Sequence, residues 1–235
     1  MIAGLGGSAL ERCSVRSGML VVVLLLPALA APQDAPAPAA AQPVAPAAAP
    51  ADAAALFAAF AKVEGLEARF REEKKLALLA APLLSQGRIY YLRPGYLARV
   101  VEQPEPATLT ITPSELRMTG RDGVETIALD QNDDLRAFVT SLVRVFSGDQ
   151  AALEASYELS YTAQGSSWDL TLTPRRPPLT EMMRGLDLHG TGVALDRIVV
   201  REPNGDTTVT TVEKADPARR FTAEEKAALF GIRPQ

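Results

Sequence analysis

The sequence has almost no cysteine and almost no histidine. Its 235 residues include one cysteine, Cys13, and one histidine, His189. Cys13 precedes a hydrophobic N-terminal run, so a chain that has lost this region has no disulfide, no thiolate nucleophile and no thiolate metal ligand. A single histidine also supplies neither a metal cluster nor a convincing Ser/His/Asp triad. We therefore expect no metal, no cofactor and no catalytic residues.

Other signatures of enzymes and of nucleic-acid-binding proteins are missing as well. The sequence has no glycine-rich phosphate loop and no G-x-S-x-G motif. Its 24 Lys and Arg residues are outnumbered by 28 Asp and Glu residues, which gives a net charge of −4. This balance argues against nucleic acid as a partner, and a hydrolase is the least favoured function class. Function is expected to come from the shape of the protein.

The first 30 residues have the pattern of a signal peptide. Arg12 and Arg16 precede an uncharged run, Ser17 to Ala31, in which Ala28-Leu29-Ala30 provides the small residues that favour cleavage before Ala31. We expect removal of residues 1–30 and export of the chain. The run is shorter than the ~20 residues that span a hydrocarbon core, so a retained membrane anchor is the less favoured alternative.

Residues 31–51 are expected to form a linker, and residues 52–235 a single folded domain. The linker is rich in Ala and Pro, has no aromatic residue and has almost no charge, so it cannot build a core. It is either a semi-extended spacer or a disordered segment without a role of its own. The remaining residues suffice for one domain with a sizeable core.

The most informative stretch is Gly87 to Glu102, GRIYYLRPGYLARVVE. Two runs rich in Ile, Tyr, Leu and Val flank Pro94-Gly95, a pair typical of turns, so the stretch predicts a β-hairpin. Period two places Ile89, Tyr91 and Arg93 on one face of the first strand. An arginine therefore ends an apolar row. The alternative to a functional role is a solvated arginine at the edge of a turn.

The rest of the domain alternates between strand and helix patterns. Period-two alternation joined by short turns predicts an antiparallel meander. Spacings of three and four predict helices that either cover the core or act as a lid over a ligand. We expect helices within 52–65, 130–147, 177–186 and 217–230, and, besides the hairpin, strands within 66–74, 108–112, 115–119, 125–129, 157–161, 168–172, 186–189, 195–201 and 207–212.

One uncharged run does not fit this alternation. Leu76 to Leu84, broken by Pro82, has nine residues without a charge. Such a run is expected either to be buried or to form a mobile apolar loop over a cavity.

The hairpin run G-x-I-Y-Y-L-R-P-G-Y-L-A-R resembles a signature of the LolA-like lipoprotein carriers: a strand, Arg-Pro, a small turn, a hydrophobic residue and Arg. A signal peptide, an N-terminal helix, many antiparallel strands and two helical inserts follow the family's order from about Asp52 to Ile232. Phe70 to Ser85 is more similar to a divergent LolA-related branch. The resemblance implies a mainly β fold with helices: a strongly curved antiparallel sheet, an incomplete and open β-barrel whose apolar concave face is lidded by helices.

The resemblance also implies a site that receives acyl chains, and it places Arg93 at the arginine of the Arg-Pro motif. An arginine there is expected to donate hydrogen bonds to carbonyls at the end of a lid helix. We assign lid gating to Arg93 and Arg99. The apolar phases of the strands and helices give the expected cavity lining as Phe70, Ile89, Tyr91, Leu97, Leu109, Ile111, Leu116, Met118, Phe138, Leu142, Trp168, Leu170, Leu172, Met182 and Met183.

The function implied by the resemblance is that of a periplasmic carrier that moves acyl chains of lipoproteins, or a related amphiphile, from the inner to the outer membrane. Its partners would be an inner-membrane releasing complex and an outer-membrane acceptor, and the protein itself would be a monomer. The alternative is an envelope sensor or interaction module on the same curved sheet, because a fold does not determine its function. The sequence does not distinguish a lipoprotein cargo from a glycolipid or polyene lipid.

Overall fold

The structure is a computed structural model that describes residues 48–232, except for the side chain of Leu142. The predicted signal peptide and most of the predicted linker lie outside the described residues. The last four linker residues belong to the fold: the amide of Ala49 donates to the carbonyl of Gly165, and the hydroxyl of Tyr161 donates to the carbonyl of Pro50.

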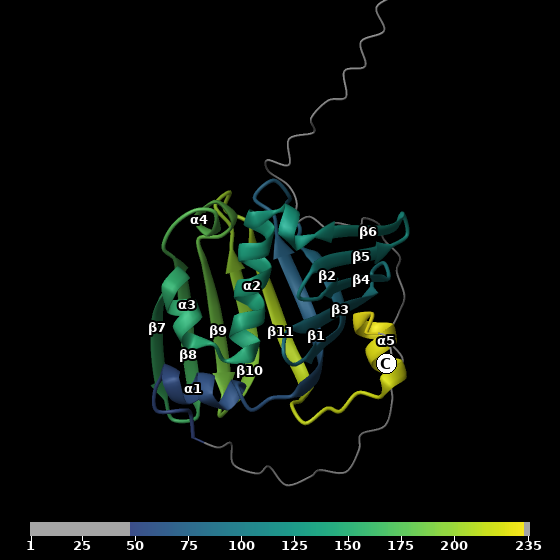
Figure 1. The fold of residues 1–235 in the computed structure, drawn as a ribbon. Helices are drawn as coiled ribbons and strands as arrows, with labels where there is room; N and C mark the ends of the chain where they lie inside the picture. Colours follow the sequence, from purple (N-terminus) through teal and green to yellow (C-terminus); the bar gives the residue numbers. More distant parts are fainter. Residues whose placement is uncertain (1–47, 233–235) are drawn as a thin grey trace, which may run out of the picture.

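Eleven strands form one antiparallel sheet (Figure 1). Their order is β6-β5-β4-β3-β2-β1-β11-β10-β9-β8-β7, so the first and last strands pair and join two meanders. The sheet curves without closing, as the sequence predicted. The strands are β1 (Gly65–Lys75), β2 (Leu83–Leu92), β3 (Tyr96–Gln103), β4 (Ala107–Ile111), β5 (Glu115–Gly120), β6 (Gly123–Ala128), β7 (Tyr157–Gln164), β8 (Ser167–Pro174), β9 (Gly185–Thr191), β10 (Ala194–Arg201) and β11 (Thr207–Asp216).

Each longer helix begins at a residue that caps its free amides. Asp52, Asn132, Asp149 and Thr222 accept hydrogen bonds from backbone amides of the first turns. The helices are α1 (Ala53–Phe60), η1 (Leu129–Gln131), α2 (Asp133–Ser147), α3 (Gln150–Ser156), α4 (Leu179–Met182) and α5 (Ala223–Phe230).

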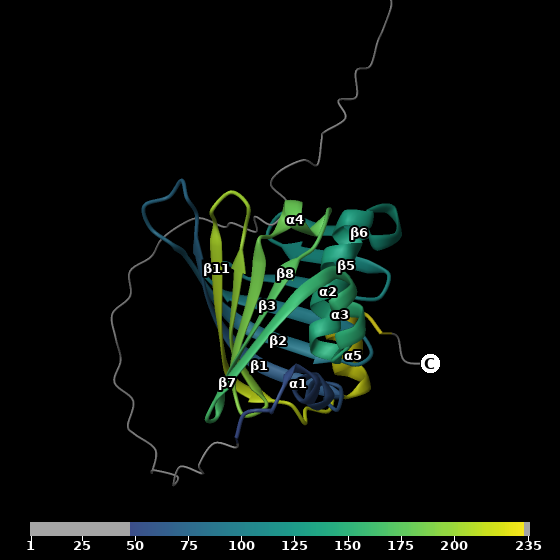
Figure 2. The same cartoon turned by 90° about the vertical axis from the view of Figure 1, so that its left-hand side faces the viewer.

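The two faces of the sheet carry separate apolar clusters. In Figure 2 the β7–β11 half and the β1–β6 half meet at an angle, and α1, α2 and α3 lie within it, on the concave face. There α1 to α4 contribute Leu56, Phe138, Leu153 and Leu179 to the larger cluster. On the opposite face, α5 packs against β3 and β4, and a smaller cluster joins Tyr90, Ala98, Phe221 and Phe230. The strand period of two therefore separates Tyr91 and Leu97 from their neighbours Tyr90 and Ala98.

Three sequence expectations need correction. The helix α3 was not foreseen, because only Leu153 of its seven residues is buried and no periodic apolar stripe marks it. The first helix ends at Phe60, and Val63 lies beyond it. Of the two alternatives for the run Leu76 to Leu84, burial is wrong, because Leu78, Leu79 and Leu84 are 96%, 49% and 66% exposed.

Gly190 provides a test of the packing on the concave face. A Cβ there would lie 2.2 Å from Cζ2 of Trp168 and 2.1 Å from the carbonyl oxygen of Ala194, a backbone atom that cannot move aside. We expect Gly190→Ala to lower the free energy of unfolding by about 1–3 kcal/mol, as overpacking does. Urea denaturation would measure it.

Gly120→Ala is the matched control, because its nearest neighbour would be Cβ of Ala107 at 4.0 Å. It should change stability by less than about 0.5 kcal/mol, as surface substitutions do. Equal effects of the two substitutions would contradict the packing of Trp168 against Gly190.

Candidate functional site

The concave face is an apolar site filled by the side chains of the protein itself. Most residues expected to line a cavity meet there. Leu97, Ile111, Leu116, Phe138, Trp168, Leu170, Leu172 and Met183 are buried in the larger cluster, and Leu109, Met118 and Met182 pack against it half-buried.

The remaining predicted residues extend this surface towards β1 and β2. Phe70 and Tyr91 are buried, and the ring of Tyr91 stacks on Phe146 of α2, with the ring centroids 5.8 Å apart. Ile89 is half-buried. Leu142 belongs to α2, but its side chain lies outside the described residues.

The short helix α1 is held over the site by aromatic contacts. The ring of Phe60 meets the indole of Trp168 edge-on at 6.1 Å between centroids, and Phe57 meets Phe60 at 6.4 Å. Such pairs are worth about 0.5–1.5 kcal/mol beyond the area they bury. Trp168 is 1% exposed, so displacement of α1 would change its surroundings.

The buried donors of this region without a hydrogen-bond partner among the described residues include the hydroxyl of Tyr91 and Nε1 of Trp168. Burial raises the pKa of Tyr91 above its ordinary value, and the nearby guanidinium of Arg93 opposes this shift. An unpaired buried polar group costs about 1–3 kcal/mol. A ligand that brings a hydrogen-bond acceptor into the apolar site would relieve this cost.

Arg93 lies where the ends of two helices meet. Its Nη2 donates to the carbonyls of Ala61, Phe60 and Ser147 at 2.6, 3.4 and 3.4 Å. Its Nε donates to the carbonyl of Val63 at 3.3 Å. The expected hydrogen bonds from Arg93 to carbonyls at a helix end are therefore present. The accepting carbonyls lie at the ends of two helices, α1 and α2, instead of one.

Electrostatics favours a cation at this position. The last carbonyls of a helix have no intrahelical partner and carry the negative end of the helix dipole. Gly148, with a φ of 74°, ends α2 and lets it approach α1, because a Cβ there would lie 2.3 Å from the carbonyl oxygen of Phe57. Arg93 and Gly148 together fasten α1 to α2.

Arg99 contacts strands instead of a helix. Its Nη2 donates to Glu72 Oε1 at 2.8 Å and to the hydroxyl of Ser85 at 3.3 Å, and its guanidinium lies 4.3 Å from the ring centroid of Phe70. Thr210 donates to the other carboxylate oxygen of Glu72 at 3.0 Å. These contacts form a polar seam of Glu72, Ser85, Arg99 and Thr210 on the concave side of β1, β2, β3 and β11.

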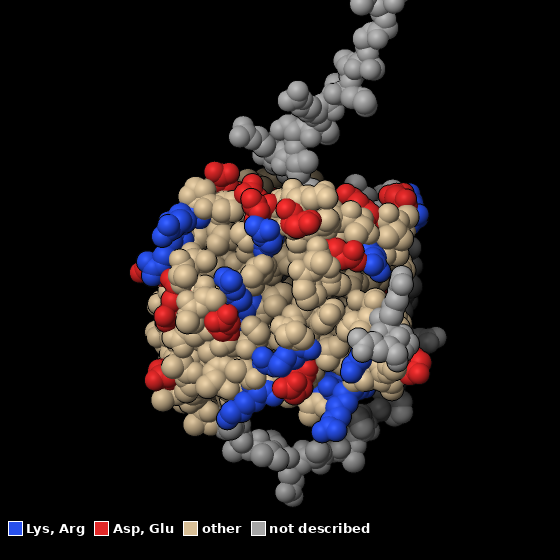
Figure 3. All heavy atoms as spheres, in the orientation of Figure 1, with Lys and Arg blue, Asp and Glu red and all other residues tan. Residues whose placement is uncertain are grey.

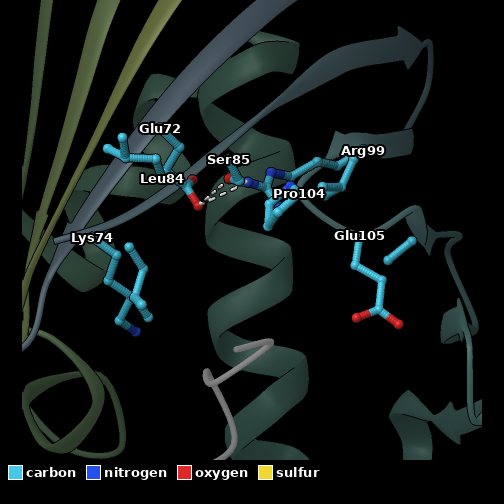
Figure 4. A pocket seen from close by; sticks show the side chains of 10 residues that line it. Glu72, Lys74, Leu84, Ser85, Arg99, Pro104 and Glu105 are labelled. Carbon is cyan, nitrogen blue, oxygen red and sulfur yellow. Dashed lines mark hydrogen bonds and ion pairs between the residues drawn. The ribbon is translucent and has the colours of Figure 1, made fainter. Parts of the chain in front are cut away.

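A small pocket of about 60 Å³ opens beside the polar seam (Figure 4). Lys74, Leu84 and Glu105 line it together with Glu72 and Arg99. Its volume corresponds to roughly two water molecules at ~30 Å³ each, so it can hold a small polar group but no acyl chain. The apolar cluster itself is filled by buried side chains, so a chain that entered it would have to displace them.

The site has no features of a metal centre or of a membrane span. Among residues 48–232, no group of three His, Cys, Asp or Glu side chains could hold a metal ion. No helix in that part of the chain has the length and apolarity needed to cross a membrane. On the face that Figure 3 shows, acidic and basic side chains are interspersed.

The sequence matches the family described as outer membrane lipoprotein carrier protein LolA-like over residues 45–230. The chain therefore belongs to this family, and its curved, unclosed sheet with covering helices agrees with that membership. A search of curated protein sequences gave no match.

Solved structures to which this chain is similar include a LolA superfamily protein from Nitrosomonas europaea. It has 10% sequence identity and a TM-score of 0.42, and the match covers 73% of this chain and 96% of that one. The complex of MucA and MucB from Pseudomonas aeruginosa has 16% identity and a TM-score of 0.41, and the match covers 71% of this chain and 57% of that one. A DUF1329 family protein from Desulfovibrio piger has 11% identity and a TM-score of 0.44, and the match covers 75% of this chain and 96% of that one.

Sequence reasoning missed the polar seam. No role is predicted for Glu72 from the sequence, but Glu72 shares the strand face of Phe70, and its side chain is only 21% exposed. The period-two alternation of side chains along β1 places Glu72 on the same face as Phe70, and this is the signal from which the polar seam could have been predicted. The partners Ser85 and Thr210 lie directly opposite Glu72 on the two neighbouring strands, and no sequence pattern gives that pairing.

Replacement of Arg93 tests whether it holds the two helices. Arg93→Leu keeps an apolar stem but removes every donor to the helix ends. We expect amide hydrogen exchange in α1 and in the last turn of α2 to become roughly tenfold faster or more, because hydrogen bonds to charged groups contribute about 1.5–3 kcal/mol. Exchange measured by mass spectrometry would show this.

Arg71→Leu is the matched control for this measurement. Arg71 lies on β1, its side chain is 71% exposed, and it pairs with Glu213 at 3.4 Å at the surface. Its replacement should leave the exchange of both helices unchanged. If Arg93→Leu behaves in the same way, Arg93 does not fasten the helices.

Proposed function

We propose that the protein is a periplasmic carrier that shelters acyl chains of lipoproteins, or of a related amphiphile, beneath α1 and α2. One observation carries this proposal: an apolar concave face is covered by helices whose ends are joined through Arg93. Membership of the lipoprotein carrier family supports it.

The free energy of acyl-chain binding requires a site that is apolar and that the protein can cover with its own side chains when no cargo is bound. Withdrawal of a C16 chain from water is worth on the order of 12 kcal/mol, at ~0.8 kcal/mol per methylene. A carrier that left a matching cavity open would bind such a chain without releasing it. Here the cluster and the helices occupy the chain's place, so that the closed state competes with cargo and limits the net affinity.

Arg93 is proposed to bias this competition towards the closed state. Cargo that enters beneath α1 must separate α1 from Trp168 and break the hydrogen bonds of Arg93 to the helix ends. Their re-formation favours release when an acceptor is present. The unpartnered donors of Tyr91 and Trp168 suit a cargo with ester or amide carbonyls next to its chains.

The proposed setting is that of a transport step between two membranes. The signal-peptide pattern of residues 1–30 supports export, and an inner-membrane releasing complex and an outer-membrane acceptor would load and unload a monomeric carrier. An envelope sensor on the same fold would bind a lipid or a protein without delivering it. Delivery is therefore the property that separates the two functions.

Binding can be followed through Trp168, the only tryptophan of the chain. A fatty-acyl ligand that displaces Phe60 should shift or quench its emission in proportion to occupancy. A four-carbon acid is the control, because it removes too little apolar surface from water to displace the helix. Tight binding of the long chain without a change at Trp168 would place the chain elsewhere, and absence of binding would refute the carrier.

Release tests the role of Arg93 in function. We expect Arg93→Leu to accept an acylated cargo but to transfer it to acceptor vesicles roughly tenfold more slowly or worse, since closure no longer helps to expel the chains. Arg71→Leu should transfer at the parental rate. Equal transfer by all three proteins would refute a gating role for Arg93. Binding of the cargo without any transfer would favour the sensor function.

A further inference from the structure

The connection from β1 to β2, residues 76–84 with the first two residues of β2 included and called the β1–β2 loop below, exposes an apolar surface at one end of the sheet. Figure 2 shows this loop projecting beyond the strands as a dark blue hairpin. Leu78 at 96%, Leu84 at 66% and Leu79 at 49% are three of the five most exposed large hydrophobic residues of the described chain. Ala77, Ala80, Ala81 and Pro82 are exposed as well, and the loop has no charged residue.

The base of the loop is fixed to the neighbouring hairpin turn between β10 and β11. The amide of Ala77 donates to the carboxylate of Asp206 at 2.8 Å, and Asp206 is buried. Lys74 pairs with Glu202 at 3.0 Å, with both side chains less than 15% exposed. The amide of Leu79 donates to the carbonyl of Leu76, which closes a turn at the tip. The apolar surface is therefore held outwards by specific contacts.

The charges at the base of the loop are balanced. Lys74 is paired with Glu202, and Lys75 with Glu73 at 3.3 Å. The loop therefore lacks the basic surplus that draws proteins to anionic lipids. An uncharged convex tip above neutralised pairs is complementary to a bilayer whose headgroups have no net charge.

The loop is also continuous with the candidate site. Leu83 and Leu84 from its end, together with Lys74 from the end of β1, line the small pocket next to the polar seam. Contact of the loop with a bilayer would bring this end of the concave face to the membrane surface.

We propose that the β1–β2 loop inserts Leu78, Leu79 and Leu84 into the interfacial region of a lipid bilayer and so docks the protein for transfer of its cargo. The proposal deepens the proposed carrier function and rests on it for the cargo. Insertion is shallow, because ion pairs surround the base, and it is driven by apolar burial. Binding to vesicles should therefore be insensitive to salt and to added anionic lipid.

The test uses protein exported and processed by its own signal sequence, mixed with vesicles of phosphatidylcholine and phosphatidylethanolamine. The parent should float with the vesicles, and added phosphatidylglycerol or salt should not change the bound fraction. The triple variant Leu78→Ser, Leu79→Ser, Leu84→Ser should lower vesicle affinity by about tenfold or more, because it removes most of the apolar area that would enter the bilayer. The double variant Leu78→Ser, Leu79→Ser, which leaves the pocket-lining Leu84 in place, should keep acyl-probe binding, read from Trp168, at the parental value.

Val124→Ser with Val193→Ser is the matched control, because these residues are 66% and 59% exposed elsewhere on the surface. This double variant should bind vesicles like the parent. In a separate variant, Leu78→Trp should gain blue-shifted emission that brominated lipids quench, while the buried Trp168 stays unquenched.

The outcomes separate the inference from the carrier function. No vesicle binding by the parent, or equal binding by the triple variant, would overturn the docking role and leave acyl binding as a separate result. Vesicle binding without acyl binding would retain the docking role and refute the carrier. If the parent forms a dimer that the triple variant abolishes, the loop is a self-association surface and the bilayer proposal is wrong.

Discussion

The architecture depends on covering the apolar inner face of a sheet that does not close. Eleven strands curve around this face, but nothing in the sheet itself shields it from water. The protein supplies the cover from short helices. The helix α1 has only eight residues, too few to be stable alone in water, so its position depends on Trp168 beneath it and on Arg93 at its end. The cover is thus the element with the fewest independent sources of stability.

This weakness suits an exchange of cover for cargo. In the proposed carrier, a cargo chain and the helix would compete for the same apolar face, so the free energy of binding would be the difference between two large terms. Every interaction that fastens α1 would then weaken cargo binding, and removal of such an interaction would favour cargo retention. Arg93 would affect this difference from the edge of the apolar face, because it acts on the helix ends where α1 and α2 converge.

The sequence allowed the fold to be predicted well because one-sided strands leave a clear period-two record. The same record assigned Leu97, Ile111 and Leu170 to the concave face. It failed where the determinant is non-local or absent: α3 has a single buried residue, and Arg99 finds its partner Glu72 two strands away. Of the two alternatives expected for the uncharged run, burial is wrong: Leu78 and Leu79 are exposed, and a hydrogen bond from the amide of Ala77 to Asp206 holds the base of the loop, a contact between distant segments that no local pattern predicts.

The polar seam makes the two ends of the concave face chemically different. Glu72 lies on β1, next to the point where the two meanders join, and its carboxylate accepts hydrogen bonds from strands on both sides. A half-buried pair of this kind adds little net stability, because desolvation opposes the Coulomb attraction, but it disfavours any register that would leave Glu72 unpaired. The seam also separates the apolar cluster from the pocket and from the exposed loop. An amphiphile that lies along this face would place its chains beneath α1 and its polar end towards the seam, the end of the molecule that the β1–β2 loop would bring to a membrane.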